Sequence, residues 1–411
     1  MRTVPTLASL LLFSAPGCGE ERAPSAGDSS GSAQGVSSSE STVEEVAGLD
    51  ETSTGNPALP GECGNGVVEG TEMCDGGEDC DDRCRVSGAV IWTWDTEQRV
   101  QDLAAIGERV VVCGRDGMTL LDVAAVDGES LDTEGEVCVR VASGAGGFAA
   151  ITVADVLSPE VASLRVFDTA GVGLWGHGNL GYDGFNSSRA AVSMSPDDEV
   201  VISSASGNLG RFRLITRYGA NGAEIWSRTV EGDESVADVN AIALAGDGGV
   251  AVAGNAAQHG LYLAVLGSKG ETLFSMTESY GAMVDEFREV ARMPDGRLAA
   301  IGIFSPTHWV GVVNPPQTEF AWITDITPAG SAADILVHPS GELIVLHNHS
   351  GGTQLSAFDS EGAPGWSMVF PDTGMQASGV SFVMLPNEDM AVALNDTSGT
   401  GRVVGIAGPR L

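Results

Sequence analysis

The sequence predicts an all-β protein in which residues 88–411 form a seven-bladed β-propeller. Three observations lead to this prediction. A hairpin unit recurs along the chain, a bulky apolar residue recurs with it, and the apolar runs lack the alternation typical of a half-exposed strand. Four-stranded blades packed around an axis explain all three, because neighbouring blades cover both faces of each sheet.

The hairpin unit is clearest in Val239–Gly254, which reads VNAIALAGDGGVAVAG. Two apolar runs flank a Gly-Asp-Gly turn, in which Gly and Asp tolerate positive φ. Pro, which presets φ at a turn corner, begins several related turns. The turns that recur in phase are Gly107-Glu108, Ala145-Gly146-Gly147, Pro196-Asp197-Asp198, Gly246-Asp247-Gly248, Pro294-Asp295-Gly296, Pro339-Ser340-Gly341 and Pro386-Asn387-Glu388.

A bulky apolar residue accompanies each unit at intervals of roughly 40 to 50 residues, the repeat length of a four-stranded blade. Seven such positions predict seven blades. Because they occur once per blade, we interpret these residues as packing between blades. They are Trp92, Leu131, Trp175, Trp226, Phe274, Trp322 and Trp366.

A third strand follows the hairpin in each unit, and a turn then leads to the next Trp strand. Predicted third strands are Leu164–Phe167, Phe212–Tyr218, Leu261–Leu266, Trp309–Val313 and Leu355–Phe358. The last of these continues as Phe358-Asp-Ser-Glu-Gly-Ala-Pro-Gly-Trp366, which is similar to the Ala-Leu-Asp-x-x-Gly-x-x-x-Trp signature of quinoprotein-like propellers. The resemblance covers about residues 88–411 and implies the architecture, since many functions share this scaffold.

The two ends of the propeller are expected to meet. Trp92 precedes the first hairpin, and Val403–Ala407 is a last strand with no Trp strand after it. We therefore predict that Ala89–Thr93 completes the blade formed by the C-terminus, which would hide two sheet edges.

The N-terminus has the pattern of an export signal. Arg2 is followed by the apolar run Leu7–Phe13 and by small residues that lead to Cys18. Residues 1–18 resemble a bacterial lipoprotein signal, which implies lipidation of Cys18 and a lipid anchor in the cell envelope, at the outer membrane, periplasmic or surface-exposed. The alternative is an ordinary secretory signal with Cys18 as a pairing or free thiol. Residues 19–60, rich in Ser, Gly and Glu, predict a disordered tether.

Cysteine usage fits an exported protein. Of seven Cys, six remain beyond Cys18, an even number where disulfides persist. Cys113 and Cys138 lie in adjacent units and are expected to pair. The other four, Cys63, Cys74, Cys80 and Cys84, lie in a module at residues 61–87 that is too short for a core of its own and needs two disulfides.

The run from Cys63 to Asp75 in this module resembles the Myxococcus cysteine-rich repeat of myxobacterial surface and secreted proteins. Its oxygen-bearing side chains make it a candidate for Ca²⁺ binding, since Ca²⁺ takes several oxygen ligands. The alternative is a solvated acidic face, and zinc is less favoured because Cys63 and Cys74 form no C-x-x-C pair. The candidate ligands are Asn65, Glu69, Glu72 and Asp75.

The net charge of −36, from 56 acidic and 20 basic residues, argues against binding to nucleic acid or to anionic lipid. Residues 88–411 contain no nucleophile-elbow, zinc-protease or Walker sequence; Gly176–Gly181 matches G-x-G-x-x-G in spacing but does not open a helix within a βαβ unit. His347 and His349 share a strand face, and Asp334 of the same unit could assist them as metal ligands or a base. The competing interpretation is exposed polar residues at a strand end.

The leading hypothesis is a surface-anchored lipoprotein whose propeller binds a protein or a glycan without catalysis, as a monomer attached to the membrane only by its lipid. The alternative is an exported propeller enzyme, either a quinone- or metal-dependent oxidoreductase or a lyase or hydrolase; a purely structural envelope protein is a third. Longer connections are where function concentrates. The candidate interaction surface is Tyr182, Asp183, Phe185, Tyr280 and Asp285.

Overall fold

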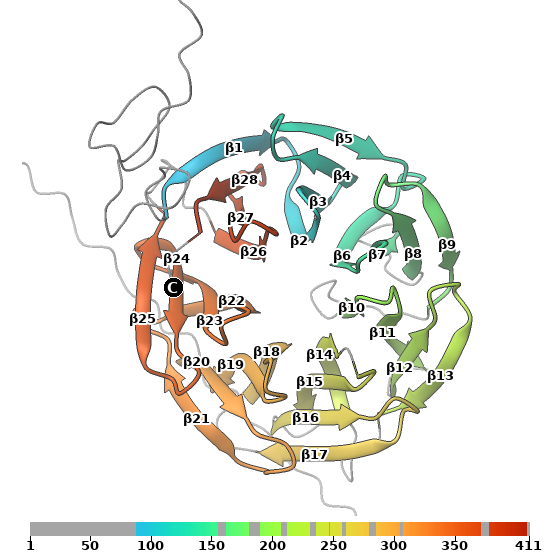
Figure 1. Cartoon of the computed structure of the whole chain (residues 1–411), viewed down its shortest axis with the longest axis vertical. Coiled ribbons are helices and arrows are strands. Elements are labelled where there is room, and N and C mark those ends of the chain that lie inside the picture. Colours follow the sequence, from blue (N-terminus) through green and yellow to red (C-terminus); the bar gives the residue numbers. More distant parts are fainter. Residues whose placement is uncertain are drawn as a thin grey trace, which may run out of the picture. The chain divides into compact units, whose positions relative to one another are not determined.

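The predicted architecture is confirmed. The computed structural model describes residues 88–154, 162–180, 190–206, 212–230, 236–245, 247–256, 260–278, 285–304, 307–370 and 378–408. They form seven four-stranded antiparallel sheets around a central axis (Figure 1). These described residues contain no helix, and so no helix that could cross a bilayer.

Each blade has one strand at the axis, two in the middle and one at the outer wall. The innermost strands of blades 1 to 7 are β2 (Val100–Ile106), β6 (Val137–Ser143), β10 (Val192–Met194), β14 (Val236–Leu244), β18 (Asp285–Arg292), β22 (Gly330–Val337) and β26 (Ser378–Met384). The second strands are β3 (Arg109–Gly114), β7 (Gly147–Val153), β11 (Val200–Ser206), β15 (Val250–Ala256), β19 (Leu298–Phe304), β23 (Leu343–His349) and β27 (Met390–Asn395). The third strands are β4 (Gly117–Asp122), β8 (Ala162–Asp168), β12 (Phe212–Tyr218), β16 (Gly260–Leu266), β20 (Thr307–Val313), β24 (Gly352–Phe358) and β28 (Gly401–Ile406). The outermost strands are β5 (Asp127–Leu131), β9 (Gly173–His177), β13 (Glu224–Thr229), β17 (Thr272–Glu278), β21 (Phe320–Asp325), β25 (Pro364–Val369) and, for blade 7, β1 (Val90–Thr96).

The ring closes as predicted, with strands from both ends of the propeller in one sheet. β1 pairs antiparallel with β28, with Thr93 opposite Val404 and Trp94 opposite Val403. Blade 7 therefore takes three strands from the C-terminal part of the chain and its outermost strand from residues 90–96 (Figure 1). Closure leaves no blade with an uncovered face.

The recurring bulky residues lie in the outermost strands, and three of the Trp side chains lock neighbouring blades together. The indole Nε1 of Trp175 donates to the carbonyl of Ala220, 2.8 Å away in blade 3. Trp226 and Trp322 make the equivalent bonds to the carbonyls of Ser268, at 3.0 Å, and Ser360, at 2.9 Å. This confirms the interpretation of the Trp repeat as packing between blades.

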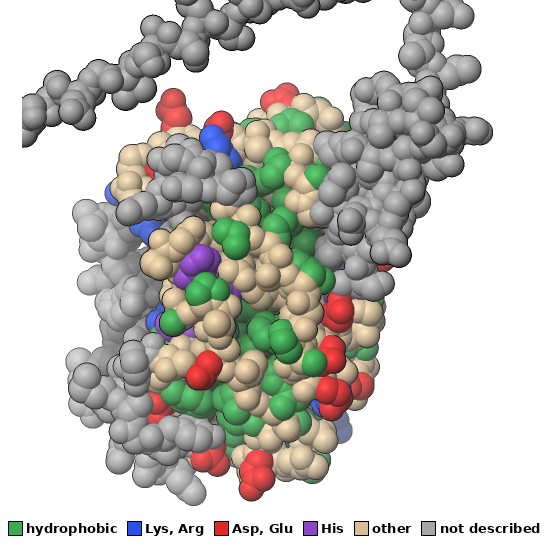
Figure 2. All heavy atoms as spheres, turned by 90° about the vertical axis from the view of Figure 1, so that its left-hand side faces the viewer, with side chains coloured by type: hydrophobic (Ala, Val, Ile, Leu, Met, Phe, Trp, Pro, Cys, Tyr) green, Lys and Arg blue, Asp and Glu red, His purple; other side chains and the backbone are tan. Residues whose placement is uncertain are grey.

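Burial falls from the middle of each blade to its wall. All seven residues of β7 and all six of β27 are buried, whereas exposed and less exposed positions mix along the outermost strands. On the face of the molecule shown in Figure 2, hydrophobic side chains occupy the middle of the wall and acidic ones lie mostly toward its borders. The continuous apolar runs of the sequence thus mark the central strands, as expected for sheets covered on both faces.

Candidate functional site

Many of the residues singled out from the sequence lie outside the described part of the chain. They remain predictions. These residues are Cys18, Cys63, Cys74, Cys80, Cys84, Asn65, Glu69, Glu72, Asp75, Tyr182, Asp183, Phe185 and Tyr280.

Asp285 is described, and it is not on a surface. Asp285 belongs to a strand and not to a connection, because β18 begins at this residue and pairs it with Phe304 of β19. The side chain is fully buried. Asp285 therefore supports the strand and does not offer an exposed contact.

Cys113 and Cys138 form a disulfide with a Cα–Cα distance of 5.2 Å. Cys113 belongs to β3 of blade 1 and Cys138 to β6 of blade 2, so the bond crosses the interface between two blades. The pairing predicted from the sequence is confirmed.

His347 and His349 share one face of β23, but Asp334 does not join them. His347 is fully buried, with its Nε2 3.0 Å from Ser356 Oγ. Burial, and secondarily the neighbouring His349, lowers the pKa of His347 to about 4, so the imidazole is neutral at physiological pH. Its contacts are those of a residue inside a blade, and Asp334 faces the central axis instead.

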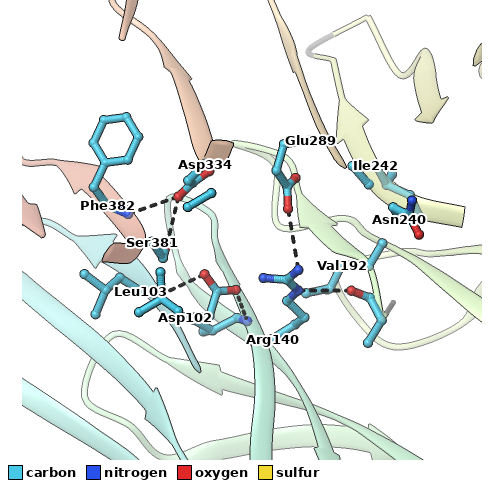
Figure 3. A pocket seen from close by; sticks show the side chains of 16 residues that line it. Asp102, Leu103, Arg140, Val192, Asn240, Ile242, Glu289, Asp334, Ser381 and Phe382 are labelled. Carbon is cyan, nitrogen blue, oxygen red and sulfur yellow. Dashed lines mark hydrogen bonds and ion pairs between the residues drawn. The ribbon is translucent and has the colours of Figure 1, made fainter. Parts of the chain in front are cut away.

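A cavity of about 200 Å³ lies at that axis, and every blade contributes to its wall (Figure 3). The lining comes from the innermost strands and from residues just before β10. One residue per blade occupies an equivalent place, five positions before the first residue of the recurring turn. We call this set the channel ring: Asp102, Arg140, Ala191, Ala241, Glu289, Asp334 and Ser381.

Local backbone irregularity aims the polar ring members inward. In β2, β6, β18, β22 and β26 the pairing with the second strand skips one residue, and the ring member is the first residue after the skip. A β-bulge of this kind bends the strand and re-aims the following side chain. Each bulge therefore turns the ring side chain toward the axis, a direction that the regular alternation of side chains along a strand would not give it.

Ring side chains and their neighbours hydrogen-bond from blade to blade. Asp102 Oδ2 accepts the backbone N–H of Val141 in blade 2, at 3.0 Å. Arg140 Nε in turn donates to the carbonyl of Ala190, at 3.1 Å, beside β10 of blade 3. These bonds hold the charged groups in fixed positions.

The same arrangement recurs on the other side of the axis. Asp334 Oδ2 accepts from Ser381 Oγ and from the backbone N–H of Phe382, both at 3.0 Å, in blade 7 (Figure 3). Across the channel, Arg140 Nη2 of blade 2 lies 3.6 Å from Glu289 Oε1 of blade 5. This ion pair spans the two blades whose ring members are the small residues Ala191 and Ala241.

Burial controls the protonation of the channel acids. Desolvation raises the pKa of Glu289 to about 8, opposed by Arg140 and reinforced by Asp334 and Asp102. Desolvation likewise raises the pKa of Asp334 to about 7, with a further increase from Asp102 and a decrease from its hydrogen bonds. The pKa of Asp102 is raised by burial as well, against the effect of Arg140. Carboxyl groups in such an environment are typical of functional sites.

Comparison with known proteins supports the fold alone. No protein-family model matches the sequence, and no curated protein matches it significantly. Among solved structures, a chain in a crystal structure of the mitotic checkpoint complex is 13% identical, with a TM-score of 0.58, over 84% of this chain and 99% of the other. The Dos1 propeller is 11% identical, with a TM-score of 0.53, over 79% and 96%. A catalytically inactive virginiamycin B lyase from Staphylococcus aureus, with quinupristin, is 11% identical, with a TM-score of 0.53, over 76% and 98%.

Proposed function

We propose that this protein is an exported, lipid-anchored β-propeller that binds a protein or a glycan of the cell envelope at its central channel, without chemical turnover. The observation that carries the proposal is the channel ring, which brings polar side chains from five blades to one cavity. Such convergence in a concave site is the usual signature of ligand recognition. The export pattern before Cys18 and the excess of acidic residues are compatible with a location outside the cytoplasm.

The hydrogen bonds of the ring favour binding. Asp102 and Asp334 each accept backbone N–H groups of the next blade, so their carboxyl groups are held in one orientation. A fixed arrangement reduces the ordering entropy that a ligand must overcome. It suits recognition better than a proton transfer that needs a carboxyl group free to meet its substrate.

A second candidate function rests on the raised pKa values of Glu289 and Asp334. Carboxyl groups that titrate near neutral pH can act as general acids or bases. A lyase or hydrolase acting on a ligand in the channel is therefore the alternative. Stacking of a quinone on Trp has less support, since no Trp lies among the described residues that line the cavity.

Site-specific photo-crosslinking in expressing cells tests the proposal. A photoreactive residue at Val192, which lines the cavity, is compared with one at Leu273, which is 62% exposed on outermost strand β17. We expect a covalent adduct of defined mass from position 192 only, containing an intact protein or glycan. Equal adducts at both positions would contradict binding at the channel, and a chemically cleaved partner would favour the enzyme.

A further inference from the structure

The described lining of the channel cavity contains more carboxyl groups than cationic groups. Three carboxyl groups, those of Asp102, Glu289 and Asp334, face one guanidinium, that of Arg140. The groups that line the cavity from blades 3, 4 and 7 are not titratable. Buried charges are stable when they are paired, so a cavity with this composition favours a cationic occupant.

Acceptors exceed donors in the cavity wall as well. A carboxylate accepts about four hydrogen bonds, more than the backbone donors around Asp102 and Asp334 supply. Asn240 adds a neutral acceptor: its side chain is 6% exposed, and its Nδ2 donates to the carbonyl of Phe287 at 2.6 Å. Its Oδ1, fixed by that bond, is buried without a hydrogen-bond partner. This unsatisfied oxygen, on a residue that lines the cavity, independently indicates a missing donor.

The two alanines of the ring provide the space. Ala191 and Ala241 occupy ring positions at which the other blades have larger side chains. They belong to blades 3 and 4, which lie between the blades of Arg140 and Glu289. The volume of the cavity, about 200 Å³, equals that of roughly six or seven water molecules in the liquid. A small organic cation or the end of one long side chain fits this volume.

A bare metal ion is a poor match for these groups. No three His, Cys, Asp or Glu side chains among the described residues converge closely enough to hold one. An ammonium group differs because it carries three N–H donors that reach acceptors spread over several blades. An ammonium group fits three features of the cavity. Its carboxyl groups outnumber its cationic groups, they are spread over several blades, and the amide oxygen of Asn240 has no hydrogen-bond partner.

We infer that the channel ring binds a protonated primary amine, held by the carboxyl groups of Asp102, Asp334 and Glu289. This inference rests on the proposed binding function and specifies its chemistry. Two sources of the group suit the proposed partners: the side chain of a lysine in a bound protein, and a free amino sugar in a glycan. The same acceptors serve both.

Titration calorimetry of the purified full-length chain tests the inference with one probe for each source, both compared at pH 7, where both amines are largely protonated; the lysine probe is measured again at pH 8.5. The probes are Nα-acetyl-lysine methylamide and the glucosamine disaccharide, and their uncharged counterparts are the norleucine analogue and the N-acetylated disaccharide. We expect at least one amine to bind and neither uncharged counterpart to do so. The tighter of the two amines identifies the source.

Substitutions connect binding to the ring. Asp334→Asn and Glu289→Gln keep the shape and an acceptor but remove the charge, and each is expected to weaken amine binding at least about tenfold. Glu129→Gln, which removes an exposed carboxyl group on β5, is the matched control and should leave binding unchanged. Binding of the lysine probe should also be tighter at pH 8.5 than at pH 6, because the channel acids must be ionised while the lysine amine stays charged at both values.

Several results would overturn the inference: no binding of either amine, equal binding of the uncharged counterparts, or an equal loss in Glu129→Gln. The crosslinking experiment does not depend on charge. An adduct at position 192 without amine binding would therefore leave the proposed function standing and remove only its amine chemistry. Amine binding without an adduct at position 192 would leave the amine site standing and remove the proposed binding of an envelope protein or glycan.

Discussion

At the scale of single residues, the contact between Trp175 and Gly222 shows how the blades are held together. Gly222 has φ +78° in the turn between the third and outermost strands of blade 3. The indole of Trp175 lies over it, so closely that a Cβ at Gly222 would be 2.7 Å from Trp175 Cδ2. The position therefore requires glycine for two reasons, its backbone conformation and the ring against it.

This double requirement predicts a large effect of Gly222→Ala, about 2–4 kcal/mol of lost unfolding free energy from backbone strain plus overpacking. Gly341→Ala is the matched control: Gly341 has φ +94° in a turn of the same kind, but nothing lies within 4 Å of its Cβ position. Backbone strain alone should lower its stability by about 1 kcal/mol. Urea denaturation of both variants checks this, and equal losses would show that the Trp contact adds nothing.

At the scale of elements, the innermost strands show what the sequence could predict. The turns at Gly107 and Pro339 located these strands, because turn residues have local conformational requirements. The inward direction of Asp102 and Asp334 could not be read from alternation, since a bulge before each shifts the pattern by one residue. The sequence pattern therefore groups Asp334 with His347, which is not among the described residues that line the channel.

A signal for the ring was nonetheless present in the sequence. Counting back five positions from each of the seven recurring turns reaches a charged residue in four repeats: Asp102, Arg140, Glu289 and Asp334. Charged residues at one position of otherwise apolar strands indicate a common surface. That these side chains meet around one cavity depends on closure of the ring together with the bulge before each of them, and the bulges were not predicted from the sequence.

The channel acids make stability depend on pH. Burial raises the pKa of Glu289 to about 8 from an ordinary 4.5, so the folded protein holds this proton more tightly than the unfolded chain. The resulting stabilisation is fully present below about pH 4.5 and is lost as the pH rises through 8. We expect the urea midpoint to fall between pH 7 and 9, above the range in which His347 contributes, and to fall less in Glu289→Gln.

The exposed Glu129→Gln serves as the control for that series and should keep the wild-type slope. Asp334, whose pKa is raised to about 7, contributes in the same direction, so some slope should remain in Glu289→Gln. A wild-type midpoint that is constant from pH 7 to 9 would refute the assigned burial of these charges.

At the scale of the whole molecule, closure connects residues that are 295 and 307 positions apart in the sequence. Arg402 Nε donates to Asp95 Oδ1 across the β1–β28 pair. Asn395 Oδ1 accepts the backbone N–H of Val100, at 2.9 Å, so β27 of blade 7 also anchors the start of blade 1. Seven turns and seven bulky residues predicted the number of blades, and the lone Trp strand at the start predicted which ends would meet.

Removing β1 should therefore destabilise the ring as a whole. Deleting residues 88–96 would leave β28 with an unpaired edge and uncover the apolar cluster that Trp92 and Trp94 pack against. We expect the thermal midpoint, followed by circular dichroism, to drop by at least about 10 °C and aggregation to begin at lower temperature. Deleting residues 40–48, the same length of the predicted tether, should change neither. If the 88–96 deletion melts like the intact chain, β1 is an accessory to the propeller and the closed ring is not what stabilises it.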